Sequence, residues 1–283
     1  MQIQKAKRIK KKIRMSIAGP SGSGKTMSAL KVAKGLCGDM DKVVVIDTEN
    51  ESAADYADVE GIEGFSTLIL HPPFDPSRYV SAIQECEKAG FEVIIIDSVS
   101  HAWIGKGGAL DMQANLGGKY QDWKKVTPVY QGMLDKILYS SAHVISCLRA
   151  KQEHAMVEKN GKTSVEKMGM GAQVRDGFEY EMTIAIELLM NHCAVVGDLG
   201  KDRTGLFASI APHILDEQDG IAIARWCNSG VEDTSHLLNE VIHKVQESGL
   251  DAEKLKELTG FNSLKGRTLE ELEQIKLTLS QVA

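Results

Sequence analysis

Short runs of aliphatic and β-branched residues alternate with segments of helical periodicity along the first half of the chain. Continuously apolar runs predict strands buried on both faces of a sheet. The predicted strands are Ile13–Ala18, Val43–Asp47, Thr67–Leu70, Val93–Asp97 and His143–Leu148. Helices are predicted at Lys25–Leu36 and at Pro76–Lys88, the second with Asp75 as its N-cap. Because parallel strands need crossover connections, this alternation predicts an α/β domain built on a mostly parallel sheet.

Beyond Leu148 the apolar runs become shorter and are separated by polar or Gly-containing turns. Runs of this kind are typical of antiparallel strands. The strands predicted from them are Met182–Leu189, Ala194–Val196 and Leu206–Ile210. We therefore expect an antiparallel extension of the sheet.

The last part of the chain shows only helical spacing of its apolar residues. Thr268 and Glu271 form a capping-box pattern before the last of these helices. The predicted organisation is therefore a basic N-terminal arm (1–12), an α/β core (13–228) and a small C-terminal helical module (231–283). For this module we expect either a docking or assembly role or a packed cap on the core.

Composition narrows the class of protein. With 43% hydrophobic and 25% charged residues among 283, the chain is expected to be globular rather than disordered or fibrous. Its apolar runs are far shorter than the roughly 18 residues that a membrane helix needs, and no hydrophobic run follows the basic N-terminus as in a signal peptide. We expect a cytoplasmic protein that does not contact a membrane. The cysteines, without any C-x-x-C pair, are expected to be buried thiols.

Charge is distributed unevenly. Residues 1–14 contain seven Lys or Arg and no acid, whereas the other 269 residues contain 26 basic and 39 acidic residues, a net charge of −13. A basic arm can attract a polyanion by releasing its counterions. The alternative is a solvated arm that only aids solubility.

The clearest motif is a phosphate-binding loop of the form G-x-x-x-x-G-K-[ST]. It lies between a predicted strand and a predicted helix, as the motif requires. Its residues are Gly19, Pro20, Ser21, Gly22, Ser23, Gly24, Lys25 and Thr26. The glycines let backbone N–H groups surround phosphate oxygens at the positive end of the helix dipole. Lys25 is expected to reach the β- and γ-phosphates and Thr26 to ligate Mg²⁺, so the predicted cofactors are ATP and Mg²⁺.

Acidic residues follow two of the predicted strands. Asp97 ends an apolar strand in the manner of a Walker B carboxylate, where it can hold Mg²⁺ beside Thr26. Glu49 follows Val43–Asp47 and is expected to face the γ-phosphate, where it can orient and deprotonate the attacking water. Two alternatives stay open: Glu49 is a solvated loop acid, or Asp47 is the base, although its place as the last strand residue favours a structural role.

Together these residues resemble the RecA core. Val43–Tyr56 followed by Val93–Ser100 is similar to the layout of RecA and RadA recombinases, in which the glutamate after the second strand is the hydrolytic base. More narrowly, the chain looks like phage-encoded P-loop ATPases that consist of a RecA core, some of which act with single-strand annealing proteins. The segments that carry this likeness are Lys11–Thr26, Val45–Ser52, His143–Lys151 and Asp198–Phe207. The resemblance covers about residues 10–228 and implies a RecA-like P-loop NTPase fold.

The resemblance also implies roles for basic residues around the nucleotide. It places a γ-phosphate sensor at the end of strand His143–Leu148, but where a recombinase has a glutamine this chain has Arg149. Lys201 and Arg203 occupy the place where RecA-like ATPases project basic residues into the neighbouring subunit's nucleotide. This implies a homo-oligomer, ring or filament, with sites at subunit interfaces. The alternative is that both are ordinary turn residues paired with Asp198 and Asp202.

Two glycine-containing segments, 101–126 and 150–177, match the mobile DNA loops of RecA. The first combines basic residues with aromatic ones, including Trp103 and Trp123, a mixture suited to single-stranded nucleic acid. The residues predicted to bind nucleic acid are Lys106, Lys119, Tyr120, Lys124, Lys125 and Lys162. The alternative is that these segments are lids or packing loops with two buried tryptophans.

The sequence and its resemblance thus predict a Mg²⁺-dependent ATPase of RecA type that binds single-stranded DNA in phage recombination or strand annealing. A single-strand annealing or single-strand binding protein is the candidate protein partner. The alternatives are a nucleotide switch that hydrolyses ATP slowly and binds a protein, and a motor for DNA packaging or unwinding.

Overall fold

The structure is a computed structural model that describes residues 6–159, 162–197, 200–231, 234–249, 252–261, 263–264 and 266–282. The chain divides into two compact units. Lys12–Trp226 forms the α/β unit, and Met1–Lys11 with Cys227–Ala283 forms the second unit.

The α/β unit is built on a sheet with the strand order β10-β8-β7-β1-β5-β4-β2-β3. Strands β7, β1, β5, β4, β2 and β3 run parallel, and β8 and β10 add antiparallel pairs at one edge. The bounds are β1 (Arg14–Gly19), β2 (Val43–Asp47), β3 (Ser66–Ile69), β4 (Val93–Asp97), β5 (His143–Lys159), β7 (Ile184–Leu188), β8 (Cys193–Val195) and β10 (His213–Ile214). Two more strands lie off this path: β6 (Lys162–Ala172) pairs with β5, and β9 (Lys201–Asp202) pairs with β7.

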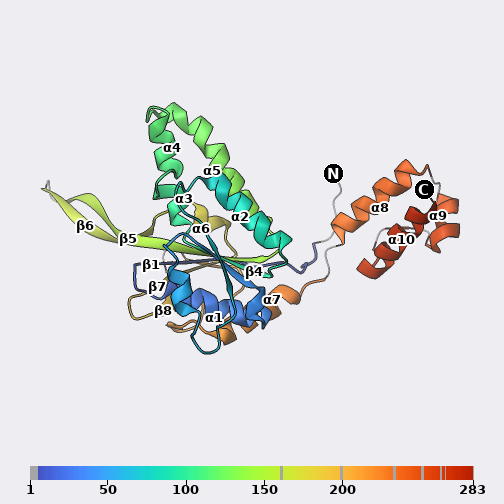
Figure 1. Cartoon of the computed structure of the whole chain (residues 1–283), viewed down its shortest axis with the longest axis horizontal. Helices are drawn as coiled ribbons and strands as arrows, with labels where there is room; N and C mark the ends of the chain where they lie inside the picture. Colours follow the sequence, from blue (N-terminus) through green and yellow to red (C-terminus); the bar gives the residue numbers. More distant parts are fainter. Residues whose placement is uncertain are drawn as a thin grey trace. The chain divides into compact units, whose positions relative to one another are not determined.

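Helices cover both faces of the sheet (Figure 1). On one face α2 (Pro76–Lys88) and α5 (Trp123–Leu138) pack on alternate residues of β2, β4 and β5. On the other face lie α1 (Lys25–Cys37) and α7 (Glu217–Asn228). These two helices approach so closely that a Cβ on Gly35 or on Gly220 would collide with the backbone of the other helix. The α/β class with a mostly parallel sheet, an antiparallel extension and C-terminal helices is therefore confirmed.

Two predictions about the extension are wrong. Strand β7, expected to be antiparallel, runs parallel to β1. The predicted strand Leu206–Ile210 forms turns instead, and the edge strand is β10. The reason lies in Asp202, whose carboxylate accepts hydrogen bonds from the N–H groups of Thr204, Gly205, Phe207 and Ala208. A side chain that satisfies these donors replaces the strand partner that the segment would otherwise need.

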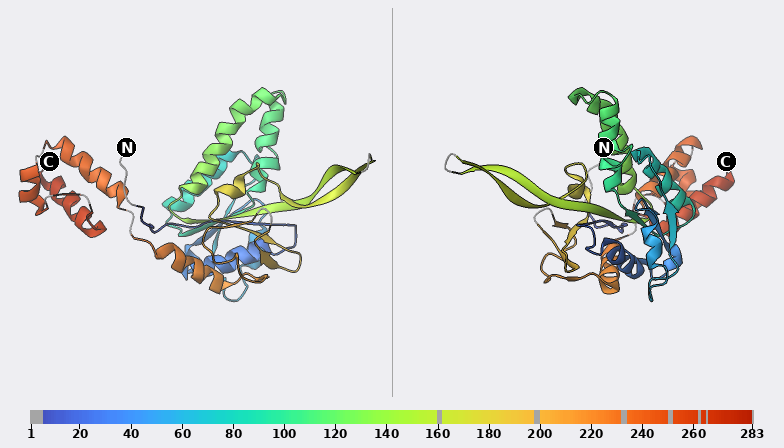
Figure 2. Two further views of the ribbon diagram at one scale, coloured as in Figure 1. Left: turned by 180° about the vertical axis from the view of Figure 1, so that it is seen from behind. Right: turned by 60° about the vertical axis from the view of Figure 1, so that its left-hand side comes forward.

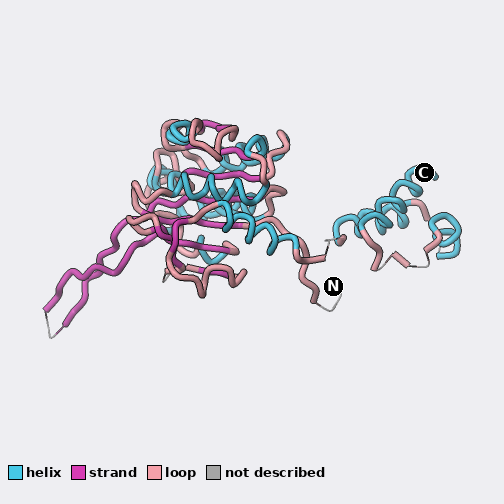
Figure 3. Tube along the Cα trace, turned by 90° about the horizontal axis from the view of Figure 1, so that it is seen from below, coloured by secondary structure: helices cyan, strands magenta, loops and turns pink. Residues whose placement is uncertain are grey.

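The two segments expected to be long loops are largely regular structure. Residues 101–126 contain most of α3 (Ser100–Ile104), α4 (Ala109–Asn115), a short 3-10 helix η3 (Tyr120–Asp122) and the start of α5. The other segment forms the ribbon of β5 and β6, which projects beyond the core (Figure 2). Figure 3 shows this ribbon as two paired magenta strands that leave the sheet together.

The second unit contains the described part of the basic arm. Lys10 N–H donates to the carbonyl of Val231, and Val231 N–H donates to that of Arg8. Arg8 and Lys10 of the arm are therefore paired with the chain after α7. Arg14, counted with the basic residues of the N-terminus, lies in the α/β unit and is 8% exposed. Its guanidinium donates to main-chain carbonyls, including those of Leu138 and Ala142, so Arg14 is a core residue and not a phosphate contact.

Three helices complete the second unit: α8 (Ser235–Glu247), α9 (Ala252–Thr259) and α10 (Leu269–Val282). They bury an apolar cluster of their own, formed by Val241, Leu255, Leu272, Ile275 and Leu279. Thr268 N–H donates to the Glu271 carboxylate and Glu271 N–H to the Thr268 hydroxyl, which is the capping box expected from the sequence. In the described part of the chain, no helix combines the length and apolar character needed to cross a bilayer.

Candidate functional site

The phosphate-binding loop joins the end of β1 to the start of α1. Gly22 and Gly24 adopt φ of 79° and 87°, in the left-handed region where a side chain would be strained. Gly19 has no room for a side chain either, because a Cβ there would lie 2.9 Å from the carbonyl oxygen of Leu188. The loop therefore curls tightly before α1 and leaves the N-terminal N–H groups of this helix available to an anion.

A cavity of about 880 Å³ opens beside the loop. It has the size of a small-molecule site, about 300–1,000 Å³. Its wall includes five of the eight loop residues, and it brings together three predicted residues from other strands, Glu49, Asp97 and Arg149. Gly19, Pro20 and Ser23 belong to the loop without lining the cavity.

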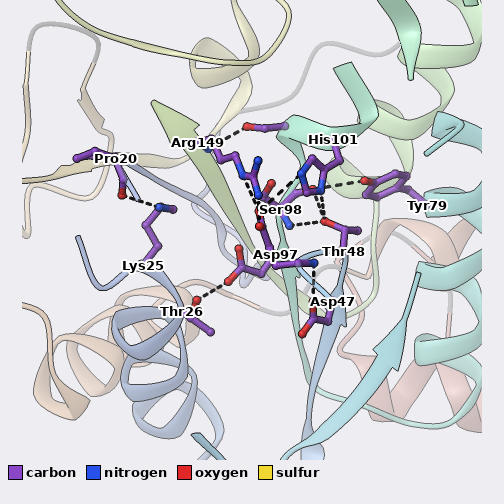
Figure 4. A network of polar contacts seen from close by, with 12 residues as sticks. Pro20, Lys25, Thr26, Asp47, Thr48, Tyr79, Asp97, Ser98, His101 and Arg149 are labelled. Atoms are coloured by element: carbon purple, nitrogen blue, oxygen red, sulfur yellow. Dashed lines mark hydrogen bonds and ion pairs between the residues drawn. The ribbon is translucent and has the colours of Figure 1, made fainter. Parts of the chain in front are cut away.

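Lys25 and Thr26, the first residues of α1, extend toward different partners (Figure 4). The Lys25 ammonium donates to the carbonyl oxygen of Pro20 at 2.9 Å. The Thr26 hydroxyl donates to Asp97 Oδ2 at 2.5 Å. Asp97 is 4% exposed, and burial, with the nearby charge of Glu49, raises its pKa to about 6. Two oxygen ligands, one of them a buried carboxylate without a cationic hydrogen-bond partner of its own, fit a Mg²⁺ ion.

Glu49 and Arg149 form a bidentate ion pair at the cavity wall. Arg149 Nε donates to Glu49 Oε1 at 2.8 Å, and Nη2 donates to Oε2. Burial by itself would raise the pKa of Glu49, but the hydrogen bonds and charge of Arg149 outweigh burial and lower it. Glu49 is therefore a held, ionised carboxylate and not a freely solvated loop acid. Arg149, expected at the γ-phosphate, is engaged with Glu49 instead.

Asp47 supports the turn that carries Glu49. It is fully buried, and its two oxygens accept hydrogen bonds from Glu49 N–H at 2.6 Å and Ala53 N–H at 2.8 Å. These bonds fix a turn in which Asn50 and Glu51 have positive φ angles of 58° and 67°. With both oxygens occupied by backbone donors, Asp47 has the structural role that its position in the strand favours.

A comparison with known families agrees with this geometry. A family model for the AAA domain matches residues 11–208, well over half of the chain. The chain belongs to the AAA domain family. This assignment makes it an AAA-type P-loop ATPase, with the loop, Asp97 and Glu49 inside the matched region. No curated protein matches the chain.

Two residues of the AAA domain site were not predicted as functional from the sequence. His101 of α3 lies 2.7 Å from the Thr48 hydroxyl through Nδ1 and 3.9 Å from Glu49 Oε1 through Nε2. His192, in the turn between β7 and β8, lines the cavity and lies 3.1 Å from the Ser23 carbonyl through Nδ1. Neither histidine belongs to a sequence motif that indicates a site. For His101 a usable signal was its place just after β4, because strand carboxyl ends in such sheets converge on one site.

Lys201 and Arg203 do not line the cavity of their own AAA domain. Lys201 pairs with Ala185 of β7, which in turn pairs with Ser16 of β1. Ser16 lies three residues before Gly19 in β1, so Lys201 is level with a point about 10 Å along the strand from the start of the phosphate-binding loop. Arg203 N–H donates to the Thr183 carbonyl, further still from the loop.

Among the described residues, neither Lys201 nor Arg203 forms an ion pair with Asp202, which was part of the alternative left open by the sequence. The Lys201 ammonium donates to the Tyr180 carbonyl, and the Asp202 carboxylate is occupied by N–H groups of its own turn. Asp198 lies outside the described residues.

The predicted nucleic-acid residues fall into two groups. Lys106, Lys119, Lys124 and Lys125 are exposed around α4, η3 and the start of α5, and Tyr120 among them is 91% exposed. Lys162 begins β6 on the ribbon, and the position of its side chain lies outside what the structure describes.

The tryptophans expected to stack on DNA stack on each other instead. The ring centroids of Trp103 and Trp123 are 5.3 Å apart, and Trp103 also packs edge-on against the buried Tyr130. This packing supports the alternative of structural tryptophans and leaves Tyr120 as the exposed aromatic residue of this helical region.

Proposed function

We propose that this AAA domain protein is a Mg²⁺-dependent ATPase of RecA type that acts on single-stranded DNA in recombination or strand annealing. The observation that carries the ATP chemistry is the convergence on one cavity of Lys25, the Thr26–Asp97 pair and the Glu49–Arg149 pair. Each has the chemistry that phosphoryl transfer to water needs: phosphate binding, metal binding, and a base beside a cation.

Lys25 exchanges the Pro20 carbonyl for the β- and γ-phosphates, and Arg149 turns from Glu49 to the γ-phosphate. Glu49, which Arg149 occupies at both oxygens, then becomes available to orient a water molecule and take its proton. Thr26 and Asp97 hold the metal site. Mg²⁺ bound there would neutralise charge on the phosphate oxygens.

Glu49→Gln tests this assignment. The variant is expected to bind ATP normally and to hydrolyse it about 10²–10⁴-fold more slowly, because the amide cannot accept the proton. Glu51→Gln is the matched control, since Glu51 is exposed in the same turn and should keep the wild-type rate. Hydrolysis by Glu49→Gln at the wild-type rate would show that Glu49 is not the base.

Single-stranded DNA is proposed as the polymer because the exposed Lys119, Lys124 and Lys125 lie close in sequence to the exposed Tyr120. Stacking on an aromatic ring combined with phosphate contacts suits unpaired bases. The test is the ATPase rate with and without single-stranded DNA at two salt concentrations, with duplex DNA of equal length as the control. Strand unwinding or translocation would instead identify a motor. A single-strand annealing or single-strand binding protein remains the proposed protein partner.

A homo-oligomer, ring or filament, is proposed because Lys201 and Arg203 lie away from their own cavity, so any contact that they make with a nucleotide is with that of a neighbouring subunit. Added positive charge at the γ-phosphate stabilises the transition state. Mixing Arg203→Ala with Glu49→Gln should restore partial turnover, because one mixed interface combines an intact base with an intact Arg203. Verified mixed oligomers that stay inactive would overturn action in trans.

The ion pair that occupies Glu49 favours one second candidate, a nucleotide switch that binds a protein and hydrolyses ATP slowly. A switch would show slow turnover that DNA does not change. Stimulation of turnover by single-stranded DNA separates the two functions.

A further inference from the structure

A chain of polar contacts leads from the end of β4 to Glu49 (Figure 4). Ser98 N–H donates to the Thr48 hydroxyl at 2.8 Å, and the same hydroxyl lies 2.7 Å from His101 Nδ1. The other ring nitrogen of His101, Nε2, lies 3.9 Å from Glu49 Oε1. The imidazole therefore stands between Thr48 and the carboxylate proposed as the base.

Packing also holds the ring of His101. It stacks on Phe74, with centroids 4.7 Å apart and planes 19° from parallel. Phe74 is itself fixed, since its N–H donates to the Lys106 carbonyl at 2.8 Å. Only 12% of the His101 side chain is exposed. A side chain locked by packing can orient its neighbour without first losing rotamer freedom.

The contact distances favour one tautomer of the ring. The Thr48 hydroxyl accepts the Ser98 N–H, and its own proton has two acceptors, the Ser98 carbonyl at 3.2 Å and His101 Nδ1 at 2.7 Å. The shorter contact favours donation to Nδ1. Nε2 then carries the proton of the neutral ring and faces Glu49. Burial lowers the pKa of His101, and the charge of Arg149 lowers it further, against the opposing charges of Glu49 and Asp47. A neutral ring with its N–H toward Glu49 is therefore the state near pH 7.

We propose that His101 is a positioning residue that holds Glu49 in its catalytic orientation once Arg149 has turned to the γ-phosphate. This inference rests on the proposed role of Glu49 as the base. When Arg149 moves away, the Glu49 carboxylate loses the two hydrogen bonds that Arg149 donates. A shift of about 1 Å brings Oε1 within hydrogen-bond range of His101 Nε2 and leaves the second oxygen free for water. The buried Ser98 hydroxyl, next to Asp97, has no hydrogen-bond partner among the described residues, so its effect on Glu49 is tested with a separate variant.

Two amide substitutions separate the two ring nitrogens. The amide nitrogen of His101→Gln reaches roughly the place of Nε2, whereas that of His101→Asn reaches roughly the place of Nδ1. We expect His101→Gln to keep kcat within about threefold of wild type. We expect His101→Asn to lose about 10–100-fold in kcat at unchanged KM, because misplacing a catalytic group by about 1 Å costs up to about 10²-fold. Ser98→Ala is expected to change kcat less than His101→Asn does.

If His101 only held Thr48 in place, kcat would be higher in His101→Asn than in His101→Gln. That order of the two kcat values would overturn the inference. Equal kcat for the two variants would overturn it too. Rates are expressed per nucleotide-binding site, so partial misfolding does not enter the comparison. In the Glu49→Gln variant, adding His101→Asn should not lower kcat further, because the carboxylate that His101 positions is already absent.

The outcomes also separate this inference from the function on which it rests. Wild-type rates in both His101 variants, together with an inactive Glu49→Gln, would remove the role of His101 and leave Glu49 as the base. A wild-type rate in Glu49→Gln would remove the base itself.

Discussion

The nucleotide cavity and the helical region around α4 and η3 are both rich in charged residues, but they hold these residues in opposite ways. In the cavity, Glu49, Asp97 and Arg149 are wholly or partly buried, and each has a side-chain partner. Around η3, Lys119 and Tyr120 extend into solvent. A carboxylate that must deprotonate water has to be fixed in advance, and fixing it in a buried place takes partners.

The exposed region has the opposite requirement. A nucleic-acid strand varies in sequence and shape, and flexible cations attract its phosphates without a fixed geometry. Substitutions should therefore act on chemistry in the first region and on affinity in the second. Three predictions test that division, beginning with the largest expected effect, and a fourth concerns the core outside both regions.

Lys25→Ala is expected to lower ATP binding and hydrolysis together by at least about 100-fold, because it removes the charge that stabilises the phosphates. Lys31→Ala is the matched control, since Lys31 lies on the same helix and also lines the cavity. Equilibrium binding of a fluorescent nucleotide and a phosphate-release assay measure the two quantities. Equal losses in the two variants would contradict a specific role for Lys25.

Arg149→Ala is expected to lower kcat about 10–100-fold and to move the acid limb of the kcat/KM profile upward, since kcat/KM reports the free enzyme, in which Arg149 pairs with Glu49. Arg149 keeps the pKa of Glu49 low, and without it burial raises that pKa. A base must be deprotonated to act, so a higher pKa means activity is lost at a higher pH. Arg149→Lys keeps the charge without the bidentate geometry, so its kcat should lie between those of the wild type and Arg149→Ala. An acid limb that stays in place in Arg149→Ala would show that Glu49 does not control it.

Replacing Lys119, Lys124 and Lys125 with alanine is expected to weaken binding of single-stranded DNA about tenfold at moderate salt. The slope of log affinity against log salt should become shallower by about 2, because each DNA phosphate that a lysine neutralises adds roughly 0.7 to it. ATP hydrolysis without DNA should keep its wild-type rate, which serves as the internal control. An unchanged salt slope would show that DNA phosphates bind elsewhere on the protein.

The smallest expected effect concerns His143, a core residue far from either function. Its Nδ1 accepts the Ile13 N–H at 3.1 Å, and burial lowers its pKa to about 3. In the unfolded chain the pKa of His143 is 6.5. Between pH 6.5 and pH 3, His143 therefore binds a proton in the unfolded chain but not in the folded protein. The contribution of His143 to stability is therefore complete above pH 6.5 and falls as the pH decreases toward 3. At pH 5.5 the loss is about 1.4 kcal/mol, or a few degrees in melting temperature.

His143→Asn provides the control for this effect, because its amide oxygen can still accept the Ile13 N–H and does not titrate. Melting of wild type and variant at pH 7.5 and pH 5.5 measures the difference. If both proteins lose the same stability between these pH values, His143 is not the group responsible.

The parts predicted correctly from the sequence are those with local stereochemical requirements. The helix start at Pro76 follows from an N-cap and a proline, and the glycines at 22 and 24 are needed for positive φ angles in the loop. The carboxylate of Asp97 lies beside Thr26 because parallel strands end at one edge of the sheet.

The predictions that failed relied on composition. The glycines and lysines between 101 and 126 are compatible with a loop and with short helices. What favours helices here is the stacking of Trp103 on Trp123, a contact that composition does not indicate. Similarly, nothing near Arg14 in the sequence indicates the main-chain carbonyls of residues 138–142 that bury it. The place of His101 depends on Thr48 and Phe74, which come from other elements. Long-range partners of this kind cannot be deduced from spacing.

The separate apolar cluster of α8, α9 and α10 affects how a melting curve of this protein is to be interpreted. A group of helices with a core of its own can lose its structure in a separate cooperative step, so heat absorption by the full chain need not fit one two-state transition. The calorimetric enthalpy would then exceed the van't Hoff enthalpy. Each transition has to be assigned to a unit before melting temperatures are compared between variants. Added nucleotide should raise the melting temperature of only one transition, and that transition belongs to the α/β unit, which holds the nucleotide cavity.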